Sequence, residues 1–265
     1  LPSMSSFNSN IPNSLFDFYG SLGLSREVNT NISDYYYPLR SLFSVKYAFY
    51  NDDMTDYLSG KPLSYTLKGF RYKENRLDYE VYENTAYIPM GFSYDYYILE
   101  EDFARLDSPL EKSLILLKAV VLDETQAKSL PYLKNLKENS AFFKRSYEQY
   151  IKDCSDRRAS ACTEFTAEND GFSATHTSEK TELVFFSVPY DSSFKATVNG
   201  VETEVLRVSE GFTAVECPAG TTEIKLVYTP PYQGITTAIS ITAFAAIFCL
   251  IALNYVKMRK KDDNA

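Results

Sequence analysis

Few residues in this chain have the types and spacing that catalysis requires. The single histidine, His176, lies in the polar segment SATHTS, and the nucleophile elbow GxSxG of a Ser-His-Asp hydrolase is absent. We therefore expect His176 to be an exposed strand residue. One histidine leaves no histidine-rich metal site, and neither GxGxxG nor a GK[ST] loop is present for nucleotides. The sequence predicts no metal and no cofactor.

Carboxylates are abundant, and a glycoside hydrolase needs only two of them at the right separation. Glu100, Glu101 and Asp102 form one such group, but they begin the segment EEDFARL, where acidic side chains favour the N-terminal end of a helix dipole. This structural explanation suffices. We assign no catalytic residue, and the substrate-binding residues stay unknown at this stage.

The four cysteines include no CxxC pair, which excludes zinc-ribbon and thioredoxin patterns. Cys154 and Cys162 lie close together in CSDRRASAC, and an oxidising compartment would permit a disulfide between them. Two reduced thiols are an equally open alternative, because an oxidising compartment permits a disulfide without requiring one. Cys217 is expected to be a buried strand residue, and Cys249 lies in an apolar segment.

Tyrosine and phenylalanine are frequent, with 22 and 18 residues, whereas tryptophan is absent. Clusters such as Tyr35, Tyr36 and Tyr37 would offer flat apolar faces with a hydroxyl group, which suits the binding of sugars. The interpretation we favour is simpler. Tyrosine is a good strand residue when one edge of its ring meets water.

Residues 235–256 contain no charge, and a helix rising about 1.5 Å per residue would be long enough there to cross a membrane. A buried core helix would seldom run so far without a charge. The basic residues Lys257, Arg259, Lys260 and Lys261 follow directly, and such residues normally stay in the cytoplasm. We expect a cytoplasmic tail and an extracytoplasmic location for residues 1–232, at a cell membrane.

Ala238, Thr242 and Ala246 recur at intervals of four residues and would form a small-residue face on this helix. Such a face lets another membrane helix approach closely, so the expected partners are upstream helices of the same protein. The alternative explanation is the general abundance of Ala and Thr in the segment.

The outer location needs a means of export, but the first residues, LPSMSSFNSN, contain neither a basic nor an apolar signal region. We expect either a removed signal peptide or a longer polytopic protein. The net charge is −8, and it is more negative still without the basic tail. An acidic outer part has no electrostatic reason to bind nucleic acid.

The expected fold class is α+β, an antiparallel β-sandwich with inserted helices followed by one transmembrane helix. An irregular segment is expected over residues 1–34, and strands at 44–50, 70–72 and 77–82. A capping box at Ser108 predicts a helix over LEKSLILLKAVVL, and an apolar stripe predicts another over 140–158. Five strands follow, ELVFFSVPY, FKATV, VETEVLRV, FTAVE and TEIKLVY, with a type I′ turn at Asn199-Gly200.

These elements predict a division into five parts. They are a mixed α/β part over 1–125, a helical segment over 126–160, a sandwich part over 161–232, the membrane helix over 233–256 and the basic tail over 257–265.

The blocks LRSLFSVKYAFY, VYENTAYIPMGFSYD and LVFFSVPYDSSFKATVNGVETEVLRVSEGFTAVECPAGTTEIKLVYTPPY, with the last running into the membrane helix, resemble the YfhO family of bacterial membrane proteins. The order of the blocks matches as well as their content. Phe194 departs from the pattern, because such proteins usually carry Trp after the PYD block, which Tyr190 and Asp191 match. A strand end and a turn explain Tyr190 and Asp191 without a ligand.

The resemblance implies a polytopic glycosyltransferase of the GT-C type. Its expected substrates are a lipid-linked sugar on undecaprenyl phosphate and an envelope polymer such as lipoteichoic acid. It places the catalytic acid in a first outer loop that this chain does not include, so no catalytic residue is transferred. The residues present would cover the catalytic face and help to position the acceptor. The alternative is a singly anchored surface module that binds glycan or protein without enzymatic activity.

Overall fold

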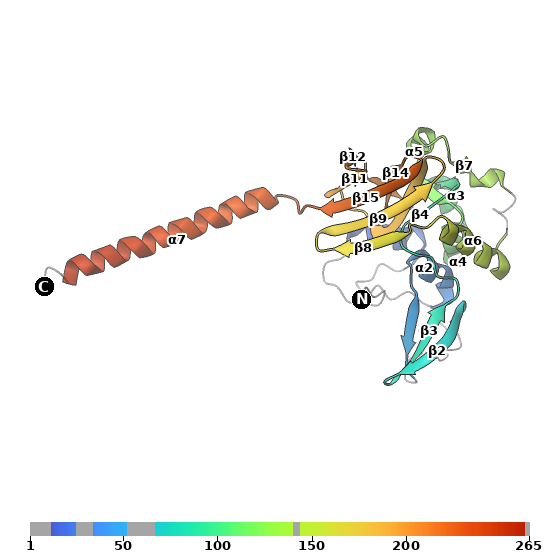
Figure 1. Cartoon of the computed structure of the whole chain (residues 1–265), viewed down its shortest axis with the longest axis horizontal. Coiled ribbons are helices and arrows are strands. Elements are labelled where there is room, and N and C mark those ends of the chain that lie inside the picture. Colours follow the sequence, from blue (N-terminus) through green and yellow to red (C-terminus); the bar gives the residue numbers. More distant parts are fainter. Residues whose placement is uncertain (1–11, 25–33, 52–66, 140–143, 263–265) are drawn as a thin grey trace. The chain divides into compact units, whose positions relative to one another are not determined.

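The computed structural model describes residues 12–24, 34–51, 67–139 and 144–262. The chain forms two compact units, Leu1–Val227 and Tyr228–Ala265 (Figure 1). The first is an α+β domain with several mostly antiparallel sheets, and the second contains one long apolar helix. The predicted fold class is therefore confirmed.

The described residues of the first unit form four sheets. Two of them form a sandwich, with strand orders β13-β14-β10-β4 and β12-β11-β15-β9-β8. The sandwich strands are β4 (Phe92–Ser93), β8 (Glu164–Glu168), β9 (Gly171–Ser178), β10 (Glu182–Pro189), β11 (Phe194–Val198), β12 (Val201–Thr203), β13 (Leu206–Val208), β14 (Phe212–Cys217) and β15 (Gly220–Tyr228).

The third sheet, β6-β5-β7, is parallel, and the fourth, β1-β3-β2, is antiparallel. Their strands are β1 (Tyr47–Tyr50), β2 (Phe70–Arg76), β3 (Tyr79–Asn84), β5 (Tyr96–Leu99), β6 (Val120–Leu122) and β7 (Lys134–Asn135). The helices of the unit are α1 (Asn13–Ser21), α2 (Tyr37–Leu42), α3 (Glu100–Ala104), α4 (Pro109–Ile115), α5 (Glu124–Ser129) and α6 (Tyr147–Ala159), with 3-10 turns at Asp34–Tyr36 and Leu136–Glu138.

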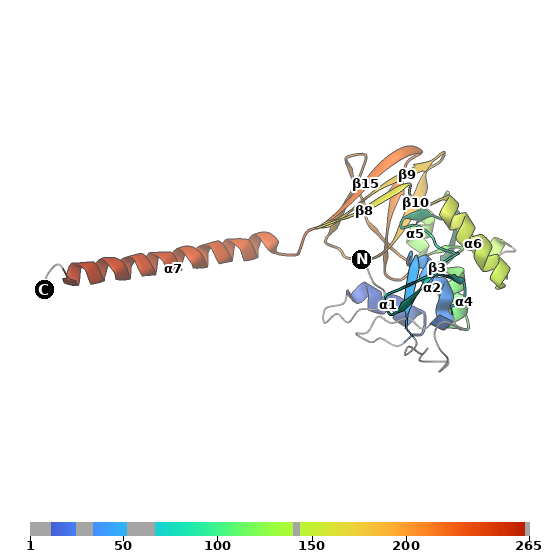
Figure 2. The same ribbon diagram turned by 60° about the horizontal axis from the view of Figure 1, so that its bottom comes forward.

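Strand β10 is buried on both of its faces. Because side chains alternate along a strand, Val184 and Phe186 point into the core between the two sandwich sheets. Leu183 and Phe185 point the other way, into a second core. Figure 2 shows β10 between the sheet of β8, β9 and β15 and the helices α2 and α4. The first unit therefore has three layers, with the four-stranded sheet in the middle.

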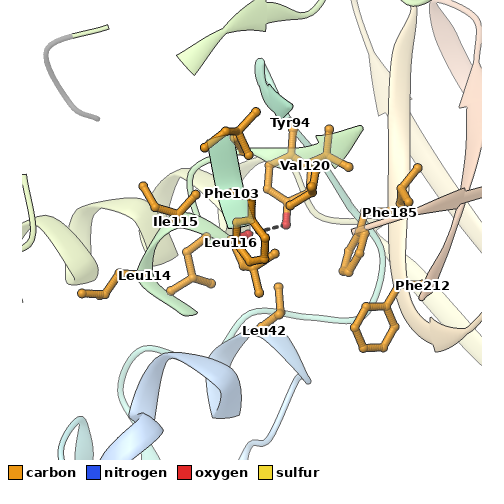
Figure 3. Packing of buried hydrophobic residues seen from close by; sticks show 14 of the residues in the cluster. Leu42, Tyr94, Phe103, Leu114, Ile115, Leu116, Val120, Phe185 and Phe212 are labelled. Atoms are coloured by element: carbon orange, nitrogen blue, oxygen red, sulfur yellow. Dashed lines mark hydrogen bonds between the residues drawn. The ribbon is translucent and has the colours of Figure 1, made fainter. Parts of the chain in front are cut away.

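The second core joins this sheet to the helices and to the parallel sheet, and Figure 3 shows its centre. Phe185 and Phe212 meet with their ring centroids 5.7 Å apart. The hydroxyl of Tyr94 is buried there and donates to the carbonyl of Leu116 at 2.6 Å, so the ring adds apolar area without leaving an unpaired polar group. This core contains residues from Phe18 to Ala214, so it crosses the expected divisions at 125/126 and 160/161.

Half of the predicted capping box is present, because Ser108 Oγ accepts a hydrogen bond from the amide of Glu111 at 3.2 Å. The Glu111 side chain accepts from the amide of Asp107 at 3.2 Å instead of that of Ser108. The helix is shorter than predicted, however, since α4 ends at Ile115. The following residues, Val120–Leu122, form the fully buried strand β6, parallel to β5. A short apolar run suits a strand buried on both faces as well as it suits a helix, which is why periodicity misassigned it.

The second predicted helix also begins later than expected. Residues 140–143 lie outside the described part, and α6 starts after Ser146, whose Oγ accepts from the amide of Gln149 at 3.2 Å. Its buried side includes Asp153, which pairs with Lys118 at 2.6 Å. Burial lowers the pKa of Lys118, and the hydrogen bond and charge of Asp153 partly offset that effect. The sequence pattern gave no indication of this ion pair.

Helix α1 lies where an irregular segment was expected. Its Phe18 is fully buried, with a ring centroid 4.6 Å from that of Phe212. A Cβ on Gly211 would lie 2.0 Å from the carbonyl oxygen of Ser14, so only glycine permits α1 to approach this turn.

The C-terminal hairpins agree with most of the prediction. Asn199 and Gly200 have φ of 53° and 77°, as a type I′ turn requires. The predicted strand VETEVLRV is instead divided, with β12 in the five-stranded sheet and β13 in the four-stranded sheet. Leu77 was expected to begin a strand, but it lies in the two-residue turn between β2 and β3.

The second unit contains α7 (Gln233–Asp262). Its segment Gln233–Asn254 has a mean hydropathy of 2.2, and none of it is buried in the structure. By length and composition this helix can cross a membrane, as the sequence predicted.

Leu77 has φ of 56°, whereas Asp78 does not have a positive φ. This is the pattern of a type II′ turn, whose first central position favours glycine. We expect Leu77→Gly to raise the free energy of unfolding by about 0.5–1 kcal/mol, because the strain removed exceeds the entropy that glycine adds to the unfolded chain. Urea denaturation would measure the change.

The matched control is Asp78→Gly in the same turn. It relieves no strain and adds only unfolded-state entropy, so it should lower stability. Equal effects of the two substitutions would contradict the strained turn.

Candidate functional site

The residue types that could perform chemistry meet at one end of the sandwich. Ser93 on β4 donates from Oγ to Glu182 Oε2 at 2.6 Å, and His176 Nε2 on β9 lies 3.0 Å from the same oxygen. Glu182 is the first residue of β10. All three side chains are buried, and they come from both sandwich sheets. This group, Ser93, His176 and Glu182, is called the buried polar cluster below.

Charged residues connect this cluster to the surface. Lys180 Nζ lies 3.6 Å from Glu182 Oε1 and 2.6 Å from Asp95 Oδ1, and both Lys180 and Asp95 are largely exposed. Arg157 of α6 donates to the carbonyl of Ser93, and its guanidinium lies 4.9 Å from the centroid of the Tyr94 ring. Side chains of alternating charge therefore connect helix α6 with both sandwich sheets.

The order of the groups does not suit nucleophilic catalysis. In a hydrolase triad the histidine lies between the nucleophile and the acid, but here Glu182 is the central group. Burial alone would raise the pKa of Glu182. Hydrogen bonds from His176 and Ser93 and the charges of His176 and Lys180 outweigh burial and lower it to about 2. A carboxylate with that pKa is a poor general base. The cluster is therefore best explained as a structural contact that holds the two sandwich sheets together.

The depressed pKa predicts a pH dependence of stability. The pKa of Glu182 is about 2 when folded and near the ordinary value of 4.5 when unfolded. The unfolded state therefore binds the proton more tightly, so this stabilisation is present above about pH 4.5 and is lost as the pH falls toward 2. Glu182→Gln should lower the free energy of unfolding at pH 7 by about 2–4 kcal/mol. It should also reduce the loss of stability as the pH falls from about 4.5 toward 2. Chemical denaturation across pH would measure both effects.

Glu216→Gln is the control, because Glu216 lies exposed on β14 and accepts one hydrogen bond from the hydroxyl of Tyr132. It should change stability by less than about 1 kcal/mol. If Glu182→Gln loses as much stability as the unsubstituted protein when the pH falls toward 2, Glu182 does not stabilise the contact between the sheets.

A different surface has groups that could bind a ligand. On the β1-β3-β2 sheet, Tyr47, Phe49 and Tyr79 are between 37% and 49% exposed, and strand register places them on one face. Lys73 Nζ lies 4.6 Å from the Tyr47 ring centroid, 3.1 Å from its hydroxyl oxygen and 3.2 Å from Glu83.

Two arginines lie on the same face. Arg71 lies opposite Glu83 and Arg76 lies opposite Tyr79. The face therefore carries aromatic rings and three cations, and the same register places the carboxylates of Glu74 and Glu83 beside them. We call these six residues the aromatic–cationic face: Tyr47, Phe49, Tyr79, Arg71, Lys73 and Arg76.

The disulfide that the sequence left open is absent from the structure. Cys154 and Cys162 are both free thiols and belong to different cores. Cys154 faces from α6 toward Tyr150 in the second core, whereas the amide of Cys162 donates to the carbonyl of Gly91 at 2.7 Å and its side chain enters the sandwich core. The two residues are close in sequence, but the end of α6 separates their side chains, which corresponds to the reduced-thiol alternative. Cys217 is buried as expected.

Burial raises the pKa of the Cys154 and Cys162 thiols to about 12. We therefore expect negligible labelling of either thiol by a thiol-specific reagent at pH 8 in folded protein carrying Cys249→Ser. Three thiols should react after denaturation in guanidinium without reductant. Recovery of a single thiol would mean that the disulfide forms.

His176 is buried, in contrast to the exposed location expected. The alternation in GFSATHTS could have indicated this, because His176 lies on the same face of the strand as the buried Phe172 and Ala174. Its Nδ1 has no hydrogen-bond partner among the described residues.

The other predicted positions are as follows. Asp191 Oδ1 accepts from the amide of Ser193 at 2.8 Å, so it serves a turn, as expected. Ala238, Thr242 and Ala246 lie exposed on α7, and Thr242 Oγ1 donates to the carbonyl of Ala238 at 2.8 Å. Their role in helix packing stays a prediction. No group of three or more potential metal ligands occurs within the described residues.

Comparison with protein families gives one match, to the model described as bacterial membrane protein YfhO, over residues 1–152 and 138–240. The chain belongs to the YfhO family. Comparisons with curated proteins and with solved structures found no match. Membership and the apolar helix α7 make this YfhO chain a membrane protein. The family expected from the sequence blocks is thereby confirmed.

Proposed function

We propose that this chain is the non-catalytic extracytoplasmic domain and last membrane helix of a membrane glycosyltransferase. The enzyme would transfer a sugar from an undecaprenyl-phosphate carrier to an envelope polymer such as lipoteichoic acid. Membership of the YfhO family supports the proposal. The basic residues after α7 support a cytoplasmic tail and an outer location for residues 1–232.

The aromatic–cationic face carries the proposal that the domain handles the acceptor. Tyrosine and phenylalanine rings offer flat apolar surfaces on which the C–H face of a sugar ring can pack, and tyrosine adds a hydroxyl. Lysine and arginine bind phosphate oxygens. A polymer of sugars and phosphates presents both chemistries together, and Tyr47 with Lys73 places both within 4.6 Å of each other.

The small-residue face on α7 has a place in the same proposal. Ala238, Thr242 and Ala246 would pack against upstream membrane helices of the same protein, where small side chains permit close approach. Thr242 already satisfies its hydroxyl within its own helix, so this packing needs no new polar partner.

The test is sugar transfer in membranes that contain the full-length enzyme. Tyr47→Ala combined with Phe49→Ala should lower kcat/KM for the polymer acceptor about 10-fold, because each lost stacking contact costs about 0.5–1.5 kcal/mol. Transfer to water or to a small acceptor should change little, since the catalytic loop is elsewhere.

Tyr35→Ala is the control, because Tyr35 is exposed on a different element. Unchanged polymer transfer in the double variant would contradict acceptor handling by this face. A native protein no heavier than this chain on an immunoblot would contradict the enzyme itself and would favour a singly anchored binding module.

A further inference from the structure

The tip of the β2–β3 hairpin exposes an apolar side chain in a strained position. Leu77 is 95% exposed and has φ of 56°. In Figure 1 the strands β2 and β3 lie apart from β8, β9 and β15 of the sandwich. Leu77 belongs to none of the three cores of the described residues.

Folding gives no reason for a leucine here. A residue with positive φ at this turn position is more stable as glycine, and a nearly fully exposed leucine gains nothing from burial within the domain. A strained and apolar residue that the fold does not need is an indication of a contact outside the folded unit.

The side chains around Leu77 identify the kind of contact. Tyr79 and Tyr72 on the two strands are both half-exposed, as is Phe49 on the adjoining β1. Arg76 precedes Leu77, and no ion pair of Arg76 is found in the described part of the chain. This arrangement matches a bilayer surface. The apolar tip suits the hydrocarbon, the tyrosines behind it suit the headgroup layer, and the arginine suits lipid phosphate.

The chain itself supplies such a surface. β15 ends at Tyr228 and α7 begins at Gln233, so a short covalent segment joins the folded unit to a membrane helix. Tethering raises the effective concentration of the bilayer at the domain, and a weak contact by one hairpin is then sufficient. Asp78, next to Leu77, restricts the contact to headgroup depth, because a carboxylate is costly in hydrocarbon.

We propose that the β2–β3 hairpin tip binds the surface of the bilayer in which α7 is anchored. Leu77 enters the interface, the hydroxyls of Tyr72 and Tyr79 stay at headgroup level, and Arg76 binds lipid phosphate. The inference goes beyond glycosyl transfer and does not require it. It needs only the membrane anchoring of the chain.

The absence of tryptophan in this sequence permits a direct test. The full chain carrying Leu77→Trp is reconstituted in vesicles of phosphatidylcholine and phosphatidylglycerol, with or without brominated acyl chains. We expect emission at shorter wavelength than that of exposed tryptophan and a loss of emission in brominated vesicles. The loss should decrease in vesicles without phosphatidylglycerol, because Arg76 then has fewer anionic headgroups to bind.

Val201→Trp is the matched control, because Val201 is 70% exposed beside the Asn199-Gly200 turn of a different hairpin. Its emission should be insensitive to brominated lipid. Insensitivity at position 77, or equal quenching at both positions, would overturn the proposal.

A second pair of variants separates Leu77 from its neighbours. Tyr79→Trp reports on the tip, and adding Leu77→Gly removes the apolar side chain while favouring the turn. Quenching of Trp at position 79 should be lost when Leu77 is glycine. Unchanged quenching would overturn the role of Leu77. A response to soluble glycerol phosphate polymer without a response to brominated lipid would show a polymer site at the tip and would also overturn the proposal.

Discussion

The structure of the folded unit depends on the burial of β10 on both faces. Leu183 and Phe185 enter one core while Val184 and Phe186 enter the other, so a single strand holds the helical layer and the outer sheet together. Each of these side chains contributes about 1.5–3 kcal/mol when fully buried. Polar groups on this strand must then be paired, and Glu182 at its beginning is paired with Ser93 and His176.

Because of that constraint, the polar residues that stabilise this YfhO chain are different from those exposed to a ligand. The titratable groups that look most like a catalytic site are buried and are used to join the sheets. The residues that we propose as a binding surface lie instead on the β1-β3-β2 sheet, whose core among the described residues is the small cluster of Ala48, Tyr50 and Leu67. A sheet with so little core can present aromatic side chains to a polymer or to a bilayer without cost to the rest of the fold.

Local sequence rules predicted what local physics determines. Strands with regular alternation, the Asn199-Gly200 turn, the cap at Ser108 and the apolar helix were all found from the sequence. Predictions failed where tertiary contacts decide. Val120–Leu122 became a strand because β5 is beside it, and α1 forms because Phe18 has a core to enter. The buried polar cluster joins residues 89 positions apart in the chain, which no spacing rule detects.

Strand β15 is the last strand of the described residues, yet it lies in the middle of its sheet, between β11 and β9. During synthesis β9 and β11 are therefore made before β15, the strand that pairs with both. Until then each has an unpaired edge, which is prone to pair with the wrong strand. α7 begins at Gln233, directly after β15, so the sheet closes only as the hydrophobic helix leaves the ribosome. Closure of the sandwich and emergence of the helix are thus consecutive events. A chaperone at the membrane would meet an incomplete sandwich until then.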